Sequence, residues 1–156
     1  MSNQHILRAQ LIYLNRSTLL LPNMAVAEVT RFDGLEPLSS APLWVHGLIQ
    51  WRGLSLPLID IDALITGDNA VLNKNPRIVV LNSISDNREI SFIAIAAAGN
   101  PHLMKLLESV IDNELAEEHS SRYIHAQYPL GKKNVWVPNL HAIEEVLVRE
   151  ASNLVT

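Results

Sequence analysis

Hydrophobic residues in this chain come in short runs that polar turn residues separate, a pattern typical of β-strands. In the first half, the pattern predicts strands over residues 9–14, 18–21, 25–32, 48–51 and 54–60. In the second half, it predicts strands over residues 77–81, 90–96, 122–128 and 135–138. The first two strands are expected to form a hairpin, because the polar residues Asn15, Arg16 and Ser17 lie between them.

Helical spacing is clear in one segment, residues 139–149. Its hydrophobic residues recur at the interval of one helix face: Leu140, Ile143, Val146 and Leu147. Asn139 stands where an N-cap residue is favoured. Single helical turns are expected at residues 43–46 and 61–65. Residues 101–107 fit a helical turn or a strand, and the pattern does not decide between them.

About nine or ten short strands and one clear helix predict a mainly β protein of one or two small barrels. Pro57 lies inside a predicted strand, which indicates a sheet edge or a bulge because proline has no N–H to donate. The length of 156 residues fits one domain, or two very small ones that share a core.

Composition and charge exclude several classes of function. The hydrophobic share of 48% against 18% charged residues excludes a disordered chain, and the net charge of −4 argues against a nucleic-acid binder. With no cysteine, the chain has no disulfide, thiol nucleophile or zinc–thiolate site. The pattern shows neither a signal peptide in residues 1–16 nor an apolar run long enough for a membrane helix, so a soluble cytoplasmic protein without direct membrane insertion is expected.

Candidate catalytic chemistry is sparse. Asp60 and Asp62 follow a predicted strand and resemble a fragment of an acidic metal site, but no third carboxylate lies nearby and helix capping explains them better. His119 and His125, beside Glu117 and Glu118, lack the spacing of metal ligands on one helix face. No serine stands in a G-x-S-x-G frame, and no glycine-rich phosphate loop occurs. The sequence therefore predicts no enzyme, metal or cofactor.

Residues 108–118 carry five acids and no base, with apolar residues spaced by four. Such a segment is expected to be a solvated stretch over the core, and an acidic docking face for a basic partner is the alternative.

Trp51, Arg52 and Gly53 place an aromatic ring and a guanidinium at a tight turn between two predicted strands. Exposed tryptophan and arginine side chains anchor many protein interfaces. An arginine at a strand end also favours a carboxylate partner, and Glu28 on a neighbouring predicted strand supplies one. Two interpretations stay open: a structural cluster in which the Arg–Glu pair holds two strands, and an interface that binds a partner.

Residues 41–61, A-P-L-W-V-H-G-L-I-Q-W-R-G-L-S-L-P-L-I-D-I, resemble the signature of CheW-like domains. That signature reads roughly P-x-x-[apolar]-x-G-[apolar]-[apolar]-x-x-R-G-x-x-[apolar]-P-[apolar]-[apolar]-D-[apolar]. Upstream, residues 19–22 and 26–29 resemble the family's second strand and the start of its third. The resemblance covers about residues 6 to 149 and is strongest in the first half.

The resemblance implies a mainly β fold of two five-stranded SH3-like or OB-like barrels that share a core, with short helices and a C-terminal helix. It implies one domain over residues 6–150. Members of the family are non-enzymatic adaptors that join the cytoplasmic tips of methyl-accepting chemoreceptors to a CheA-type histidine kinase. A chemotaxis adaptor, without cofactor or metal, is therefore the expected function.

The resemblance also implies a partner-binding set. Arg52 matches the signature arginine, which lies near the family's receptor-binding groove and pairs with the glutamate that Glu28 matches. The signature glycines correspond to Gly47 and Gly53, and Gly53 is expected to supply a positive φ at the turn. Two of the three tryptophans lie in the same segment, so Trp44 and Trp51 join the set as candidate anchors.

The sequence departs from the family pattern in three places. Gln50 stands where the family has asparagine, residues 94–98 lack an expected aspartate, and the acidic segment 108–118 is atypical. These departures predict a divergent or accessory adaptor, such as one that serves type IV pili and twitching motility. Two rival hypotheses are a small metal-dependent hydrolase that uses Asp60, Asp62 and a histidine, and a β-barrel binding module outside chemosensing.

Overall fold

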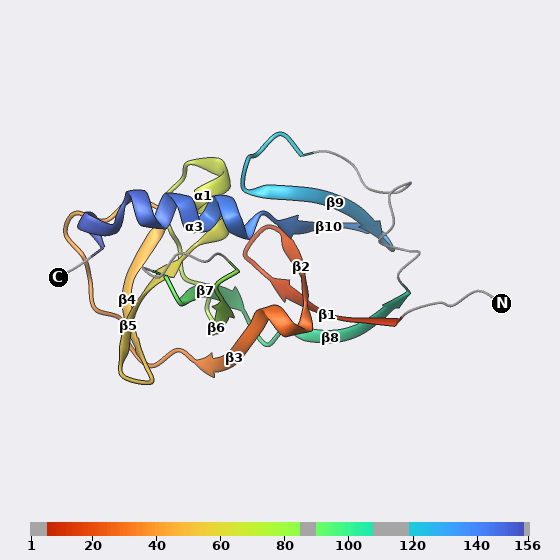
Figure 1. The fold of residues 1–156 in the computed structure, drawn as a ribbon, viewed down its shortest axis with the longest axis horizontal. Coiled ribbons are helices and arrows are strands. Elements are labelled where there is room, and N and C mark those ends of the chain that lie inside the picture. Colours follow the sequence, from red (N-terminus) through yellow and green to blue (C-terminus); the bar gives the residue numbers. More distant parts are fainter. Residues whose placement is uncertain (1–5, 85–89, 108–118, 155–156) are drawn as a thin grey trace.

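Ten strands form two five-stranded sheets in the computed structural model of the chain, which describes residues 6–84, 90–107 and 119–154 (Figure 1). The first sheet has the order β8-β1-β2-β10-β9. Its strands are β1 (Ile6–Tyr13), β2 (Thr18–Pro22), β8 (His102–Leu107), β9 (Ile124–Leu130) and β10 (Lys133–Pro138). The second sheet has the order β3-β6-β7-β5-β4. Its strands are β3 (Val26–Arg31), β4 (Val45–Trp51), β5 (Leu54–Ile59), β6 (Pro76–Asn82) and β7 (Phe92–Ala98).

The two ends of the chain meet in the first sheet, whereas the second sheet comes from one continuous stretch (Figure 1). Most neighbours are antiparallel, and β1 pairs with β2 as the hairpin that the sequence predicts. Two pairs are parallel, β10 with β2 at Trp136 and Leu19, and β5 with β7 from Leu58 on. The mainly β fold with two five-stranded units is confirmed.

Three local expectations meet a different outcome. The single turn expected at residues 43–46 is present but lies one residue earlier: the carbonyl of Pro42 accepts the N–H of Val45 at 3.1 Å, and the chain then extends into β4. Residues 101–107, which fitted two structures, form β8 because β1 offers that segment a partner strand. β7 and β9 each begin two residues later than the pattern suggests, at Phe92 and Ile124.

Pro57 lies in β5, which is an internal strand of the second sheet. The pairing of β5 with β7 begins only at Leu58, so Pro57 has β4 beside it and stands at a local edge. A proline there removes no ladder hydrogen bond. The bulge of this region is instead in β4, where the register shifts between Val45 and Gly47.

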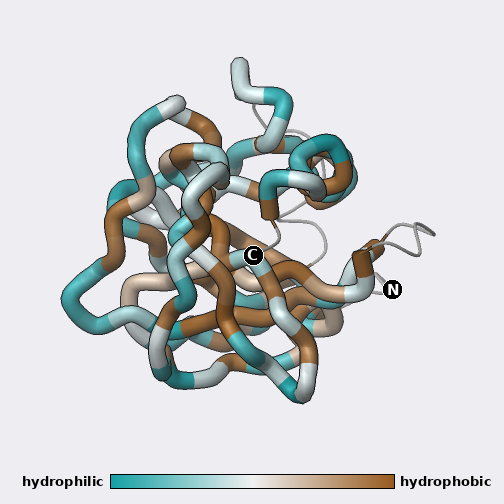
Figure 2. Tube along the Cα trace, turned by 90° about the vertical axis from the view of Figure 1, so that its left-hand side faces the viewer, coloured by the Kyte–Doolittle hydropathy of each residue, from teal (hydrophilic) through white to brown (hydrophobic). Residues whose placement is uncertain are grey.

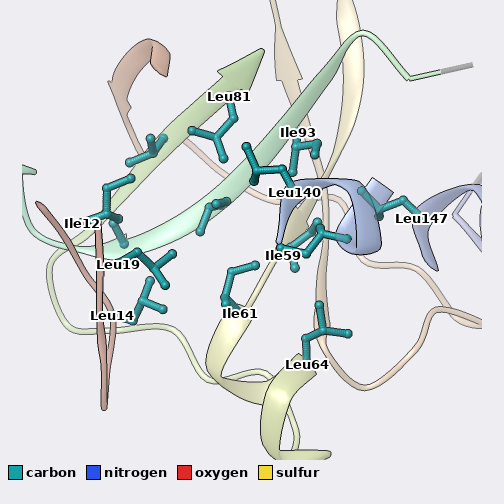
Figure 3. Packing of buried hydrophobic residues seen from close by; sticks show 14 of the residues in the cluster. Ile12, Leu14, Leu19, Ile59, Ile61, Leu64, Leu81, Ile93, Leu140 and Leu147 are labelled. Carbon is teal, nitrogen blue, oxygen red and sulfur yellow. The ribbon is translucent and has the colours of Figure 1, made fainter. Parts of the chain in front are cut away.

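Both sheets pack into one shared core. Figure 3 shows Ile12 and Leu19 of the first sheet facing Ile59 and Leu81 of the second, with Leu140 of the C-terminal helix beside them. Four aliphatic side chains are fully buried: Ile12, Leu19, Ile59 and Leu81. The burial of each one stabilises the fold by about 1.5–3 kcal/mol. Aliphatic side chains dominate this core, as the scarcity of aromatic residues leads one to expect. The shared core fixes the two sheets relative to each other.

The C-terminal helix α3 (Leu140–Arg149) runs from the end of β10 along the second sheet (Figure 1). Asn139 caps it by accepting the N–H of Ala142 at 3.1 Å, as the sequence predicts. Figure 2 shows hydrophobic residues gathered inside the trace and hydrophilic ones at its outer turns. Within the described ranges, no helix has the length and apolar character needed to cross a membrane.

Three further short helical elements lie in the described part of the chain. The helix α1 (Ile61–Thr66) follows β5, and its N-cap Asp60 accepts the N–H of Ala63. It ends at Gly67, whose φ of 79° is in the left-handed region. The 3₁₀ turns η1 (Asn23–Ala25) and η2 (Ala151–Asn153) precede β3 and follow α3.

Candidate functional site

Glu28, Trp51 and Arg52 form one connected group of side chains, here called the Glu28 cluster. Glu28 lies on β3, Trp51 ends β4, and Arg52 begins the turn to β5. The indole Nε1 of Trp51 donates to Oε2 of Glu28 at 2.9 Å, and Nη2 of Arg52 donates to Oε1 at 2.7 Å. The guanidinium carbon of Arg52 lies 4.9 Å from the centre of the Trp51 ring. The carboxylate therefore joins the two strands that edge the second sheet.

The turn that carries Arg52 is strained. Trp51 pairs with Leu54, so Arg52 and Gly53 are the two central residues of the hairpin turn. Their φ angles are 47° and 78°, as a type I′ turn requires. Gly53 adopts this angle freely, whereas Arg52 is the one residue other than glycine with a positive φ in the described ranges. A left-handed arginine costs about 1–2 kcal/mol, and its contacts to Glu28 and Trp51 offset part of that cost.

The charges of the cluster differ in exposure. The Arg52 side chain is 67% exposed and that of Glu28 is 33% exposed. The hydrogen bond from Trp51, followed by the one from Arg52, lowers the pKa of Glu28 below its ordinary value. The carboxylate thus stays ionised at neutral pH and holds the guanidinium at the surface.

Trp51 is 6% exposed, so the expectation of an exposed tryptophan anchor at this position is wrong. Its ring packs edge-on against Phe92 at 4.7 Å between centroids, in a cluster with Leu56 and Val80. Its N–H donates to Glu28, and the Arg52 guanidinium lies over its ring. The structural interpretation of Trp51 therefore holds, and its side chain sets the position of Glu28.

Trp44 lies at the other end of β4 and does not join the cluster. Its half-buried side chain packs on the shared core, and its carbonyl accepts the N–H of Asp60 at 2.8 Å. Gly47 is buried inside β4 with a φ of 150°. A Cβ there would lie 2.5 Å from the carbonyl oxygen of Glu36, which bonds to the N–H of Leu48. Gly47 thus lets the loop after β3 pair with β4.

An open groove of about 700 Å³ lies beside the Glu28 cluster. It is lined by residues of β3, of β4 and of the loop between them, including Arg31, Asp33 and Gln50. Gln50 donates to the hydroxyl of Ser55 across the hairpin at 2.7 Å. The groove places both acidic and basic side chains beside the exposed guanidinium, which suits a polar protein contact.

Asp60 and Asp62 both accept hydrogen bonds from the backbone. Asp60 accepts the N–H groups of Ala63 and Val71, at 3.0 Å each, and Asp62 accepts the N–H of Arg16 at 2.9 Å. The capping interpretation therefore accounts for Asp60. In the part of the chain that the structure describes, no group of three metal-binding side chains occurs.

His46 lies near Asp60 with its Nε2 3.8 Å from Oδ2, beyond hydrogen-bond distance. Burial lowers the pKa of His46 and outweighs the charge of Asp60, which raises it. His119 accepts the N–H of Ser121 and packs on Trp136, while His125 is exposed on β9. Glu117, Glu118 and the acidic segment 108–118 lie outside the described residues. The histidines therefore supply no catalytic arrangement with Asp60 and Asp62.

The geometry around the signature segment agrees with a comparison to known families, in which the model of the CheW-like domain matches residues 8–146. The chain belongs to the CheW-like domain family. The crystal structure of the scaffolding protein TtCheW from Thermoanaerobacter tengcongensis is similar, with a TM-score of 0.68 and 14% sequence identity over 90% of each chain. At that identity the likeness concerns the fold. None of the curated proteins matches the chain.

CheW-like proteins are non-enzymatic scaffolds, so this chain is not an enzyme and is a chemotaxis scaffold or adaptor. Among the residues that the sequence analysis selected, the structure brings Glu28, Trp51, Arg52 and Gly53 together. Trp44 and Gly47 lie at the other end of β4, where the Trp44 carbonyl bonds to Asp60 and Gly47 leaves room for the Glu36 carbonyl. In this CheW-like domain, Arg52 is the most exposed member of the Glu28 cluster, at 67% for its side chain.

Proposed function

We propose that this CheW-like protein couples the cytoplasmic tip of a methyl-accepting chemoreceptor to a CheA-type histidine kinase. It works in the cytoplasm as part of a two-component signalling system, and binding is its whole mechanism. The Glu28 cluster and the groove beside it contact the receptor, while the ends of the barrels contact the kinase. The fold is one CheW-like domain over residues 6–150, built of two barrels.

The exposed Arg52 on a strained turn is the observation that carries this proposal. Among the described residues, its side chain donates to Glu28 alone, so several of the five guanidinium donors face solvent. A fixed guanidinium loses less conformational entropy on binding than a free one, and it binds a carboxylate or a backbone carbonyl in a defined direction. Retaining arginine where asparagine or glycine would relieve strain supports a role for this side chain beyond folding.

Charge reversal at Arg52 tests the receptor contact. Arg52→Glu should abolish pull-down by the receptor tip, because two carboxylates then repel each other and the donors are gone. Lys132→Glu is the matched control, since it makes the same change in charge at an exposed turn of the other sheet. A thermal melt of each variant separates binding from folding. Unchanged pull-down by Arg52→Glu contradicts the receptor contact, and a lost melting transition makes the pair structural instead.

The output of the system is proposed to be type IV pili. The support is divergence from the family pattern: β7 reads Phe-Ile-Ala-Ile-Ala-Ala-Ala and lacks the aspartate expected near Ile95. An accessory adaptor of this kind fits a pathway apart from the main flagellar one. Deletion of the gene should reduce twitching and leave swimming intact, and a receptor gene and a kinase gene should lie nearby. Loss of swimming alone would contradict the pilus assignment.

A further inference from the structure

Strands β1 and β8 share a face that is both apolar and basic where it extends beyond the shared core. Ala9 and Leu11 of β1 pack in the smaller cluster with Leu20 and Leu106, so Ile6, Arg8 and Gln10 lie on the opposite face, the one on which Ile12 enters the shared core. By the same alternation, Leu106 of β8 is buried and its neighbours Lys105 and Leu107 are exposed. The face made of Ile6, Arg8, Gln10, Leu103, Lys105 and Leu107 is called the β1–β8 strip below.

Aliphatic side chains at both ends of this strip are open to solvent. Ile6 is 61% exposed, Leu103 is 57% exposed and Leu107 is 39% exposed. The register places Ile6 opposite Leu107 at one end and Gln10 opposite Leu103 at the other. Clustered exposed aliphatic residues on one face are typical of a contact surface, whereas single ones are ordinary.

Two cations lie directly opposite each other in the middle of the strip. Arg8 of β1 pairs in register with Lys105 of β8, and both residues are exposed. Residues paired in this way have Cβ atoms about 4.5–5.5 Å apart, and like charges so placed destabilise a sheet. Neither side chain has an ion-pair or hydrogen-bond partner among the described residues. A carboxylate supplied from outside would relieve the repulsion.

We propose that the β1–β8 strip binds an acidic amphipathic helix of a partner protein, with a carboxylate of that helix between Arg8 and Lys105. The aliphatic ends of the strip lie four residues apart along β1, about 13 Å at the rise of a strand. In a helix, residues i and i+8 are about 12 Å apart on one stripe, with i+4 between them. The strip therefore selects leucine at i and i+8 and glutamate at i+4.

Two other occupants fit less well. A twofold contact between copies of this strip would bring the cations of one copy against those of the other. An anionic membrane also attracts basic and apolar side chains, but two cations supply little binding and the chain carries a net charge of −4. An acidic protein helix satisfies both the aliphatic ends and the basic centre.

Two synthetic helical peptides test the selection directly. Both carry leucine at i and i+8, one has glutamate at i+4 and the other glutamine, and vesicles of anionic lipid serve as a third probe. The glutamate peptide should shift the backbone amide resonances of β1 and β8 in NMR spectra and bind about tenfold more tightly than the glutamine peptide. Equal affinity of the two peptides, binding of neither, or preference for vesicles overturns the proposal.

Lys105→Glu separates binding from stability. This change places opposite charges across the strands, so the melting temperature should rise by about 1–3 °C. The same change should lower the affinity for the glutamate peptide by about tenfold, whereas Lys132→Glu should leave that affinity unchanged. A variant that gains stability and keeps full affinity overturns the proposal. Arg52 takes no part in these measurements, so this result is independent of the receptor contact proposed above.

The acidic segment 108–118 follows β8 directly and offers a carboxylate from within the chain. Replacing its acids by the corresponding amides tests whether they compete for the strip. Unchanged affinity for the glutamate peptide supports an external partner. A tenfold gain in affinity overturns the proposal, because the chain would then satisfy its own cations.

Discussion

The hydroxyl of Ser17, in the turn between β1 and β2, donates a hydrogen bond of 2.5 Å to the carboxylate of Asp62 on α1. Ser17 belongs to the first sheet's hairpin, whereas α1 follows the last residues of β5 in the second sheet. Asp62 is 8% exposed, and its other oxygen accepts the N–H of Arg16. This buried carboxylate therefore links the β1–β2 turn of the first sheet to the helix that follows the second sheet.

Replacement of Asp62 by alanine should lower the free energy of unfolding by about 2–3 kcal/mol, because it leaves the Arg16 N–H and the Ser17 hydroxyl without their acceptor. Urea titration followed by circular dichroism measures the change. Asp68→Ala is the control, since the Asp68 side chain is 61% exposed and pairs with Arg16 at 3.5 Å. Its effect should stay within about 0.5 kcal/mol. Equal losses from the two variants would contradict the role given to Asp62.

Gly47→Ala should destabilise the protein by more than about 2 kcal/mol, because the new methyl group meets the carbonyl of Glu36 and the φ is positive. Gly34→Ala is the matched variant. Gly34 also has a positive φ, 102°, but open space surrounds its Cβ position, so only the backbone contributes, at about 1 kcal/mol. Denaturant midpoints of the two variants separate the steric contact from the backbone strain. A smaller loss at Gly47 than at Gly34 refutes this account.

The lowered pKa of Glu28 predicts a dependence of stability on pH. Its ionised form is favoured in the folded protein, first by the Trp51 N–H and then by Arg52. The contribution to stability is therefore present above the ordinary pKa of 4.5 and is lost as the pH falls through the folded-state value. In thermal melts between about pH 3 and 7, the wild type should lose stability more steeply than Glu28→Gln at the acidic end. Parallel curves would show that the hydrogen bonds do not favour the carboxylate.

Arg52→Asn should keep the fold while removing the guanidinium. Asparagine followed by glycine favours a type I′ turn, which offsets the loss of an exposed ion pair, so the free energy of unfolding should stay within about 1 kcal/mol of the wild type. Receptor pull-down should nevertheless fall, as is expected for Arg52→Glu. Full binding by this variant would place the contact elsewhere on the surface. Differential scanning calorimetry and pull-down on the same preparation give both results.

Much of the fold follows from local pattern. Alternation placed most of the strands, and helical spacing with Asn139 placed α3, because each signal reflects which face of an element is buried. The pairing of Glu28 with Arg52 also followed, since the sequence indicated a carboxylate for the turn arginine. These predictions depend on neighbours in the chain or on a strong charge preference.

Long-range packing explains what the pattern missed. A tryptophan before a turn is apolar whether it faces water or Phe92, so the sequence did not reveal that Trp51 is buried. In residues 101–107, Leu103 and Leu107 are four apart, an interval that fits one face of a helix as well as one face of a strand, so the pattern does not decide until β1 supplies a partner. Arg8 lies opposite Lys105 only because β1 pairs with β8, and the local sequence pattern does not predict that pairing.

The arrangement of strands also sets an order of events during synthesis. The second sheet uses residues 26–98 without interruption, so all its strands are available before the C-terminal third has left the ribosome. β1 and β2 are made first, yet β2 must wait for β10, more than a hundred residues later, to occupy its second edge. Long sequence separations of this kind slow folding. The first strands to be synthesised therefore complete their sheet only when the last strand, β10, has been made. A truncation that removes β10 leaves one edge of β2 unpaired, whereas the second sheet keeps all its strands.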